Sequence, residues 1–159
     1  MGIENDSSVN ENSTADIVNK YRNDVSMLTP YLPWLLEHAD TSVSESYSSD
    51  ELSHSISFPV YDSTLLSFVK KAQETKLLDR NYVYVYSRNH LSSAADELSF
   101  IKNAQIQDMG DLAGIISGYV LRGMTKGSVW SEGVHNKVLY SVIAKMQELI
   151  TFWGNGEGV

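Results

Sequence analysis

The chain has 159 residues, of which 42% are hydrophobic and 20% charged, and its formal net charge is −8. This length suffices for one domain whose core needs no covalent staples. Because cysteine is absent, disulfides and thiolate metal sites are excluded, and the acidic balance disfavours direct nucleic-acid binding. No apolar run is long enough for a membrane span, and the polar beginning of the chain lacks a signal-peptide pattern. We therefore expect a cytoplasmic protein that does not enter membranes.

The negative charge is concentrated in the first two fifths of the chain. Residues 1–62 contain eleven acidic and two basic side chains, whereas the remainder has nine acidic and ten basic ones. Polar composition predicts a disordered tail over 1–12 and a frayed tail over 154–159. Between them we expect a single helical domain, 13–153. It is interrupted by a mobile, acidic, serine-rich loop at 40–57, where serine and threonine weaken helices.

Helical periodicity and capping residues define most of the predicted elements. Ser13 and Asp16 fit a capping box in front of the first one. Pro30 suits a first helical turn, and Asp62 or Ser63 can cap a later helix. The predicted helices in this part of the chain are 14–28, about 30–39, about 62–78 and about 92–104. Residues 82–86 read YVYVY, an alternation that is typical of an extended segment.

The C-terminal third carries the clearest helical signal. Apolar residues recur from Leu112 to Val120 at the spacing of one helix face, and a second stripe predicts a long last helix over about 132–153. Glycines at 110, 114 and 118 predict a close approach of another helix, since glycine lacks the Cβ that keeps helices apart. We expect an all-α protein: an irregular bundle of about five to six helices with one short extended segment near 82–86.

No catalytic constellation is evident. The four histidines lack metal-binding spacing, and neither a serine-nucleophile motif nor a phosphate-binding glycine loop occurs. We therefore assign no catalytic residue, metal or cofactor. Arg122 and Glu132 bracket the connection between the last two helices, where a salt bridge would fix the loop. Alternatively, Arg122 binds an anionic ligand beside Trp130, or Glu132 and His135 form an acid–base pair.

Three tyrosines lie in the YVYVY segment. Tyr82, Tyr84 and Tyr86, together with Arg80 and Arg88, could stack single-stranded bases. The acidity of the chain favours another use, in the core or in a protein interface, where tyrosine buries area while its hydroxyl stays hydrogen-bonded.

Four pieces of the sequence, in this order, resemble an uncharacterised bacterial family known only as a domain of unknown function. They are FPVYDSTLLSFVKKA (58–72), LLDRNYVY (77–84), DLAGIISGYVLRG (111–123) and WSEGV (130–134), and YLPWLLEHAD (31–40) is similar to the opening of the family. The resemblance implies a small, mainly helical protein and no established activity. The matching positions are Phe58, Pro59, Tyr61, Asp79, Tyr82, Arg122, Gly123, Trp130, Glu132 and Gly133.

These observations favour a non-catalytic interaction or regulatory protein. Its acidic N-terminal part would bind a basic protein partner, as in a phage or mobile-element inhibitor of a nucleic-acid-binding protein. The candidate partner-binding residues are Glu45, Asp50, Glu51, Tyr82, Tyr84 and Tyr86. The alternative is a small enzyme or anion-ligand-binding protein whose site contains Arg122, Trp130, Glu132 and His135. Homo-oligomerisation is left open.

Overall fold

The computed structural model describes residues 2–39 and 62–158, with side chains from Thr14 to Ala39 and from Asp62 to Gly154. The described residues form helices and no strand, so the all-α prediction is confirmed. The predicted loop at 40–57 and the acids Glu45, Asp50 and Glu51 lie outside the described residues. The elements are α1 (Gly2–Leu28), η1 (Thr29–Tyr31), α2 (Leu32–Glu37), α5 (Ser63–Glu74), α6 (Tyr82–Arg88), α7 (Ala94–Asn103), η2 (Ile106–Asp108), α8 (Met109–Thr125), α9 (Ser128–His135) and α10 (Val138–Gly158).

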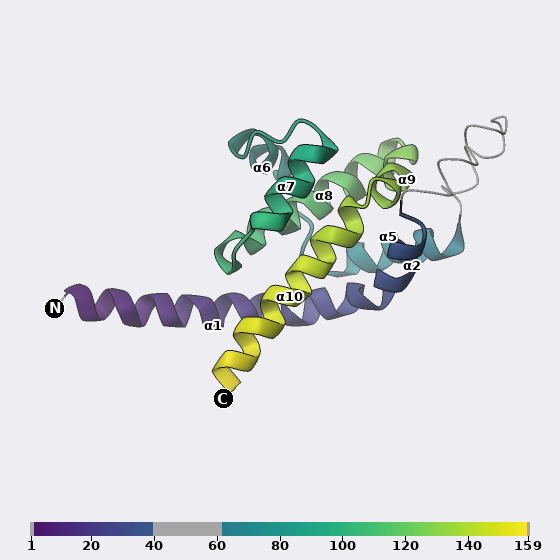
Figure 1. The fold of residues 1–159 in the computed structure, drawn as a ribbon. Helices are drawn as coiled ribbons and strands as arrows, with labels where there is room; N and C mark the ends of the chain where they lie inside the picture. The colour runs from purple at the N-terminus through teal and green to yellow at the C-terminus, as the bar shows by residue number, and fades with distance from the viewer. Residues whose placement is uncertain (1, 40–61, 159) are drawn as a thin grey trace.

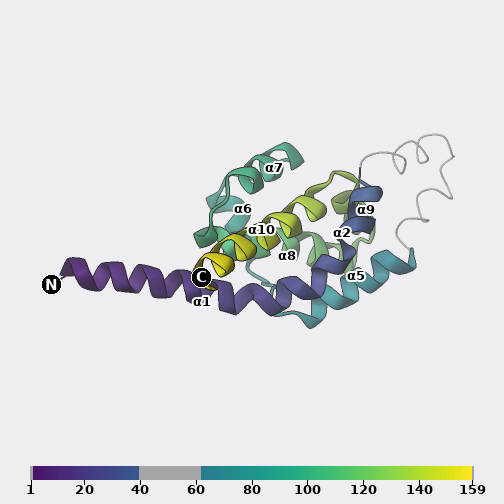
Figure 2. The ribbon, with the colours of Figure 1, turned by 60° about the horizontal axis from the view of Figure 1, so that its bottom comes forward.

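Helix α8 is the central element of the bundle. Every residue from Leu112 to Val120 is buried, so this helix is covered on all sides rather than along one stripe. Helix α10 packs against α8 and also against α1 and α7 (Figures 1 and 2). Ile116, Val138 and Ile143 are each at most 1% exposed. The prediction that the C-terminal apolar stripes pack together is therefore confirmed.

Residues 82–86 are helical, and the extended segment predicted there is wrong. In α6 the side chains of Tyr82, Val85 and Tyr86 share one face, because they are spaced i, i+3 and i+4. That face lies on α8, while Val83 and Tyr84 point outward with exposures of 59% and 66%. The β-like alternation is overridden because the described residues contain no strand that could pair with this segment, whereas α8 offers it a close-packing surface.

Glycines of α8 make this close contact with α6 possible. A Cβ on Gly114 would lie 2.6 Å from the nearest methyl carbon of Val85, and one on Gly118 would lie 3.1 Å from the ring of Tyr86. Close packing at these two glycines is thus confirmed. Gly110 differs, because its Cβ would meet only the hydroxyl of Tyr21, at the ordinary contact distance of 3.6 Å.

The last predicted helix is divided into two. Helix α9 begins at Ser128, within the predicted connection between Arg122 and Glu132, and α10 begins only at Val138. Lys137 lies between them with φ of 71°, in the left-handed region that a continuous helix excludes. The side chain of Asn136 accepts a hydrogen bond from the Val138 N–H at 2.9 Å and thereby caps the new helix.

Both ends of the chain differ from the expected tails. Helix α1 begins at Gly2 instead of residue 14, and α10 continues to Gly158. Acidic residues near the beginning of α1 favour helix there, because they interact well with the positive end of the helix dipole. The N-terminal part of α1 projects beyond all other helices (Figures 1 and 2).

Candidate functional site

A buried carboxyl group lies where α6, α7 and α8 meet. Glu97 of α7 is only 4% exposed, although glutamate is rarely buried without a partner. Its two oxygens accept hydrogen bonds from the hydroxyl of Tyr86, at 2.5 Å, and from that of Tyr119, at 2.6 Å. Asn136 donates to the Tyr119 hydroxyl at 3.0 Å. Each oxygen of the Glu97 carboxyl group therefore has a tyrosine hydroxyl as its partner.

The two tyrosines are held in their protonated form. Burial raises the pKa of Tyr86 well above its ordinary value, and the hydrogen bond to Glu97 raises it further. The pKa of Tyr119 is raised for the same two reasons, in the same order. Both hydroxyls therefore remain donors to Glu97 throughout the physiological pH range.

Arg122 lies above the two tyrosine rings, near the end of α8. Its guanidinium carbon is 5.1 Å from the centre of the Tyr119 ring and 5.9 Å from that of Tyr86, which are cation–π distances. Its Nε donates to the Gly118 carbonyl at 2.9 Å. Among the described residues no ion pair involves Arg122, and the N–H groups of its two terminal nitrogens have no hydrogen-bond partner there.

These residues surround a pocket of about 220 Å³. One wall is the turn before α7, where the backbone N–H and hydroxyl of Ser92 both donate to Asp96 at 3.0 Å. These bonds hold the pKa of Asp96 below its ordinary value. The pocket is lined by Tyr86, Leu91, Ser92, Ser93, Ala94, Glu97, Tyr119, Arg122 and Glu132.

The structure brings together only two of the four residues predicted to bind a ligand. Arg122 and Glu132 line this pocket, whereas Trp130 and His135 are not among its lining residues. The predicted Arg122–Glu132 salt bridge does not form among the described residues, because α9 replaces the expected loop and Arg122 lies over the tyrosine rings instead.

Trp130 has a structural contact of its own. Its Nε1 donates to the Val120 carbonyl at 2.9 Å, and a Cβ on Gly123 would overlap its ring. This tryptophan therefore joins α9 to α8. His135 is the last residue of α9 and is half-buried.

The three tyrosines predicted to form a partner-binding surface do not share one. Successive helical residues point about 100° apart, so Tyr82 and Tyr86 face α8 while Tyr84 faces solvent. Arg88, the base at the end of α6, is paired with Asp111 at 2.5 Å. A row of tyrosines on which bases could stack is therefore absent from α6.

Sequence reasoning missed Glu97, the most buried charged residue described. The spacing of its neighbours contained a signal. Ala94, Glu97, Ile101 and Ala104 follow one another at intervals of three or four residues, so Glu97 lies on the apolar face of α7. Ala95, the next residue after Ala94, is exposed and lies off this face.

Comparisons with family models, with curated proteins and with solved structures find no match to this chain. The resemblance to a bacterial family of unknown function therefore remains a prediction. No described helix has the length and apolar character needed to cross a bilayer. Among the residues with described side chains, no three histidine, aspartate or glutamate groups converge as metal ligands.

Proposed function

We propose that this protein is a non-catalytic interaction protein that binds a basic protein partner through its acidic N-terminal part, residues 1–62. The observation that carries the proposal is the charge separation along the chain: this part has eleven acidic and two basic side chains, and the rest is nearly neutral. Complementary charge accelerates encounter and selects partners. Nucleic-acid-binding proteins have basic surfaces, so a phage or mobile-element inhibitor of such a protein is one form that this function could take. We also propose that the protein is cytoplasmic.

The course of α1 supports this proposal. Glu4, Asp6 and Glu11 belong to the projecting part of the helix, and the first basic residue of the chain is Lys20. An isolated helical segment of this length is marginally stable in water and usually needs packing against another element. A basic partner would supply both that packing and the compensating charge.

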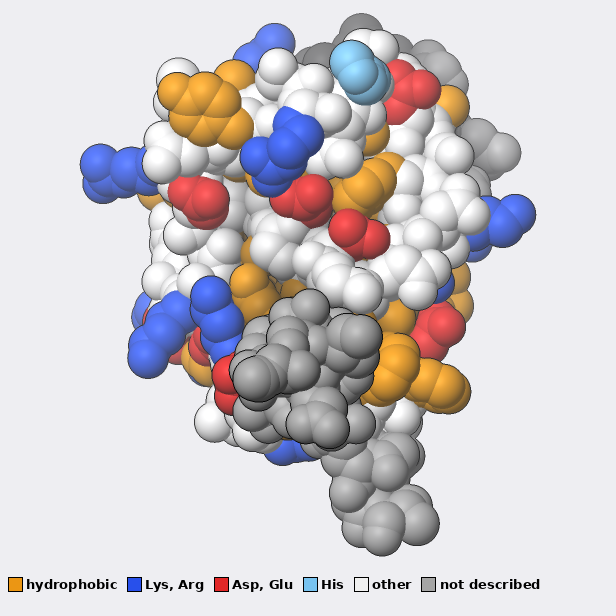
Figure 3. All heavy atoms as spheres, turned by 90° about the vertical axis from the view of Figure 1, so that its left-hand side faces the viewer, with side chains coloured by type: hydrophobic (Ala, Val, Ile, Leu, Met, Phe, Trp, Pro, Cys, Tyr) orange, Lys and Arg blue, Asp and Glu red, His pale blue; other side chains and the backbone are white. Residues whose placement is uncertain are grey.

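The rest of the surface has a different character. Figure 3 views the molecule from the side toward which α1 projects, and acidic, basic and apolar side chains are interspersed on the bundle there. On this face the bundle therefore offers no surface of a single charge to a basic partner.

The test compares variants of the full-length chain that each replace two glutamates by glutamine. Wild-type and variant proteins are immobilised and exposed to a lysate of the source organism. The retained proteins are identified by mass spectrometry, and the amount of each that is retained is measured at increasing salt concentration. Two of the variants each remove two of the eleven acidic charges of residues 1–62, and the third is a control elsewhere in the chain. The three pairs are Glu4→Gln with Glu11→Gln, Glu45→Gln with Glu51→Gln, and Glu74→Gln with Glu148→Gln.

We expect one basic protein to be retained by the wild type and by the Glu74/Glu148 control. At least one of the other two variants should lose most of it, and retention by the wild type should fall as salt is raised. The proposal is refuted if no basic protein is retained, or if all three variants retain it equally.

A further inference from the structure

The pocket beside Glu97 offers one hydrogen-bond acceptor and one donor that are not fully used by the described part of the chain. A carboxylate has about four lone-pair positions, and the tyrosine hydroxyls take only one on each oxygen of Glu97. The Nε of Arg122 donates to the Gly118 carbonyl, and the guanidinium group lies over the rings of the two tyrosines. Among the described residues, its two terminal nitrogens remain as hydrogen-bond donors. The pocket therefore presents an unsaturated acceptor and an unsaturated donor.

These two groups lie at different depths. Glu97 is nearly fully buried, whereas Arg122 and Glu132 belong to the exposed residues of the lining. A charged carboxylate that is buried without a cation is costly, so a positive group that enters this pocket gains a partner of unusual strength. A negative group held by Arg122 would remain near the opening, where guanidinium binds carboxylates in a planar, two-pronged geometry.

We propose that this pocket binds a small amino acid, with its ammonium group at Glu97 and its carboxylate at Arg122. Glu132, the second acid of the lining, disfavours ligands that carry only negative charge. The volume of about 220 Å³ lies below the range of roughly 300–1,000 Å³ found for drug-sized ligands, and it suits a molecule of a few carbon atoms. This inference is independent of the proposed partner binding, because it uses none of residues 1–62.

The test uses calorimetric titration of the full chain with ligands that separate the two charges. Glycine, β-alanine and γ-aminobutyrate carry both groups at increasing separation, butyrate carries only the carboxylate, and butylamine carries only the ammonium. We expect at least one of the three amino acids to bind at least tenfold more tightly than both butyrate and butylamine.

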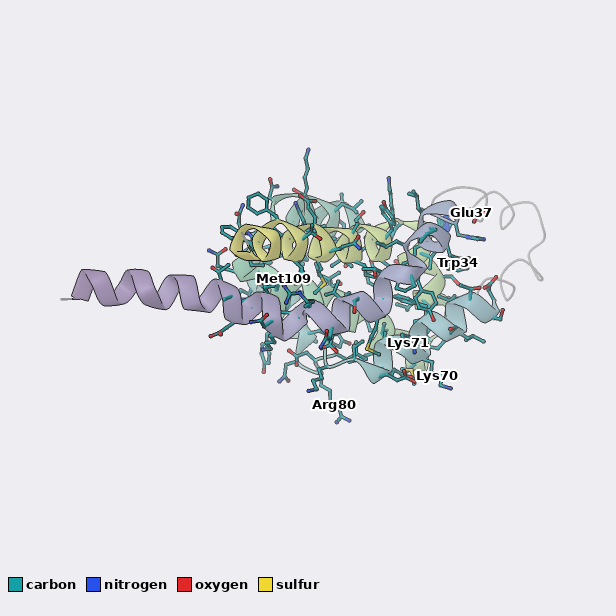
Figure 4. All side chains as sticks on the ribbon, turned by 90° about the horizontal axis from the view of Figure 1, so that it is seen from below. Trp34, Glu37, Lys70, Lys71, Arg80 and Met109 are labelled. Carbon is teal, nitrogen blue, oxygen red and sulfur yellow. The ribbon has the colours of Figure 1, made fainter. Side chains whose placement is uncertain are left out.

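Two matched pairs of variants assign the ends of the ligand. Arg122→Gln should abolish the preference for the amino acid over butylamine, and Glu97→Gln should abolish the preference over butyrate. The controls Arg80→Gln and Glu74→Gln should bind like the wild type, since Glu74 is exposed and Arg80 points away from the bundle (Figure 4). Thermal unfolding of each variant verifies that it is folded. Glu132→Gln, at an exposed position, should enhance binding of butyrate even if Glu97→Gln does not fold.

The proposal is overturned if none of the three amino acids binds. It is equally overturned if butyrate or butylamine binds the wild type as tightly as the best amino acid, or if Arg122→Gln and Arg80→Gln have the same effect.

Discussion

The packing of α6 on α8 can be tested by adding a single methyl group. In a helix interior, replacing glycine by alanine ordinarily stabilises by up to about 1 kcal/mol. At Gly114 the new Cβ would lie 2.6, 3.1 and 3.3 Å from three carbons of Val85, one of which is the Val85 Cβ. Rotation of the valine cannot clear its own Cβ, and valine has one strongly preferred rotamer in a helix. Helix α6 itself must therefore shift.

The magnitude follows from these opposing effects. Overpacking of a core typically costs about 1–3 kcal/mol, and the absence of a side-chain escape places Gly114→Ala at the upper end. After the gain in helix propensity is subtracted, we expect a net loss of ~2 kcal/mol in the free energy of unfolding. For a chain of this size, that loss lowers the midpoint of thermal unfolding by roughly 4–8 °C.

Gly110→Ala is the matched control, because the same change on the same helix meets only an ordinary contact with Tyr21. It should leave stability unchanged or raise it by up to about 1 kcal/mol. Urea unfolding followed by circular dichroism measures both variants. In a Val85→Ala background the Gly114→Ala change should destabilise less, since the two Cγ carbons of Val85 are removed while its Cβ, at 3.1 Å, remains. Equal effects of the two glycine substitutions in the otherwise wild-type chain would refute this reasoning.

Three further predictions concern the core and the tyrosines. Phe68 is fully buried, with its ring centre 5.5 Å from that of Tyr31. Phe68→Ala should lower the free energy of unfolding, measured with denaturant, by about 3–5 kcal/mol. A decrease of less than about 1 kcal/mol would contradict its place in the core. Trp130→Phe removes the hydrogen bond to the Val120 carbonyl and should lower the free energy of unfolding by about 1 kcal/mol in the same measurement. An unchanged midpoint would show that this hydrogen bond does not stabilise the contact between α9 and α8. Because the pKa values of Tyr86 and Tyr119 are raised by folding, the folded chain binds more protons than the unfolded one at alkaline pH. Their contribution to the free energy of unfolding is complete below about pH 10, the pKa of tyrosine in the unfolded chain. It is lost as the pH rises through the higher pKa values of the folded protein. The free energy of unfolding should then fall with pH above 10, and less steeply in Tyr86→Phe and Tyr119→Phe; identical slopes in all three proteins would disprove the assignment.

The helices of the C-terminal third could be predicted because their information is local. The apolar residues of α8 and α10 recur at helical spacing over many turns, and Ile116, Val138 and Ile143 are buried accordingly. The break at Lys137 could not be foreseen in this way. Lys137 has a left-handed backbone between α9, which packs on α8, and α10, and hydrophobic periodicity carries no information about such a break.

The nature of α6 and the burial of Glu97 depend on residues far away in the sequence. The YVYVY segment has a local strand pattern, and the glycines of α8 that make it pack as a helix come later in the chain. A glutamate is ordinarily assigned to the surface. The spacing of its neighbours places Glu97 on the apolar face of α7, but the two tyrosine hydroxyls that pair with its carboxyl group come from α6 and α8 and could not be foreseen. Arg122 and Glu132 could be proposed as ligand-binding residues from their places at the ends of neighbouring helices, but Glu97 and Tyr119 of the same pocket could not.

The carboxylate of Glu97 has a consequence for how the native state fluctuates. Its hydrogen-bond network draws one side chain from α6, one from α7, one from α8 and one from the junction of α9 and α10. If any of these helices detached, a carboxyl or hydroxyl group would remain in an apolar interior without its hydrogen-bond partner. The free energy of the opened state would then include the desolvation penalty of that group. Subglobal opening of this half of the molecule should therefore be concerted, and its slowest amide protons should exchange together as one foldon.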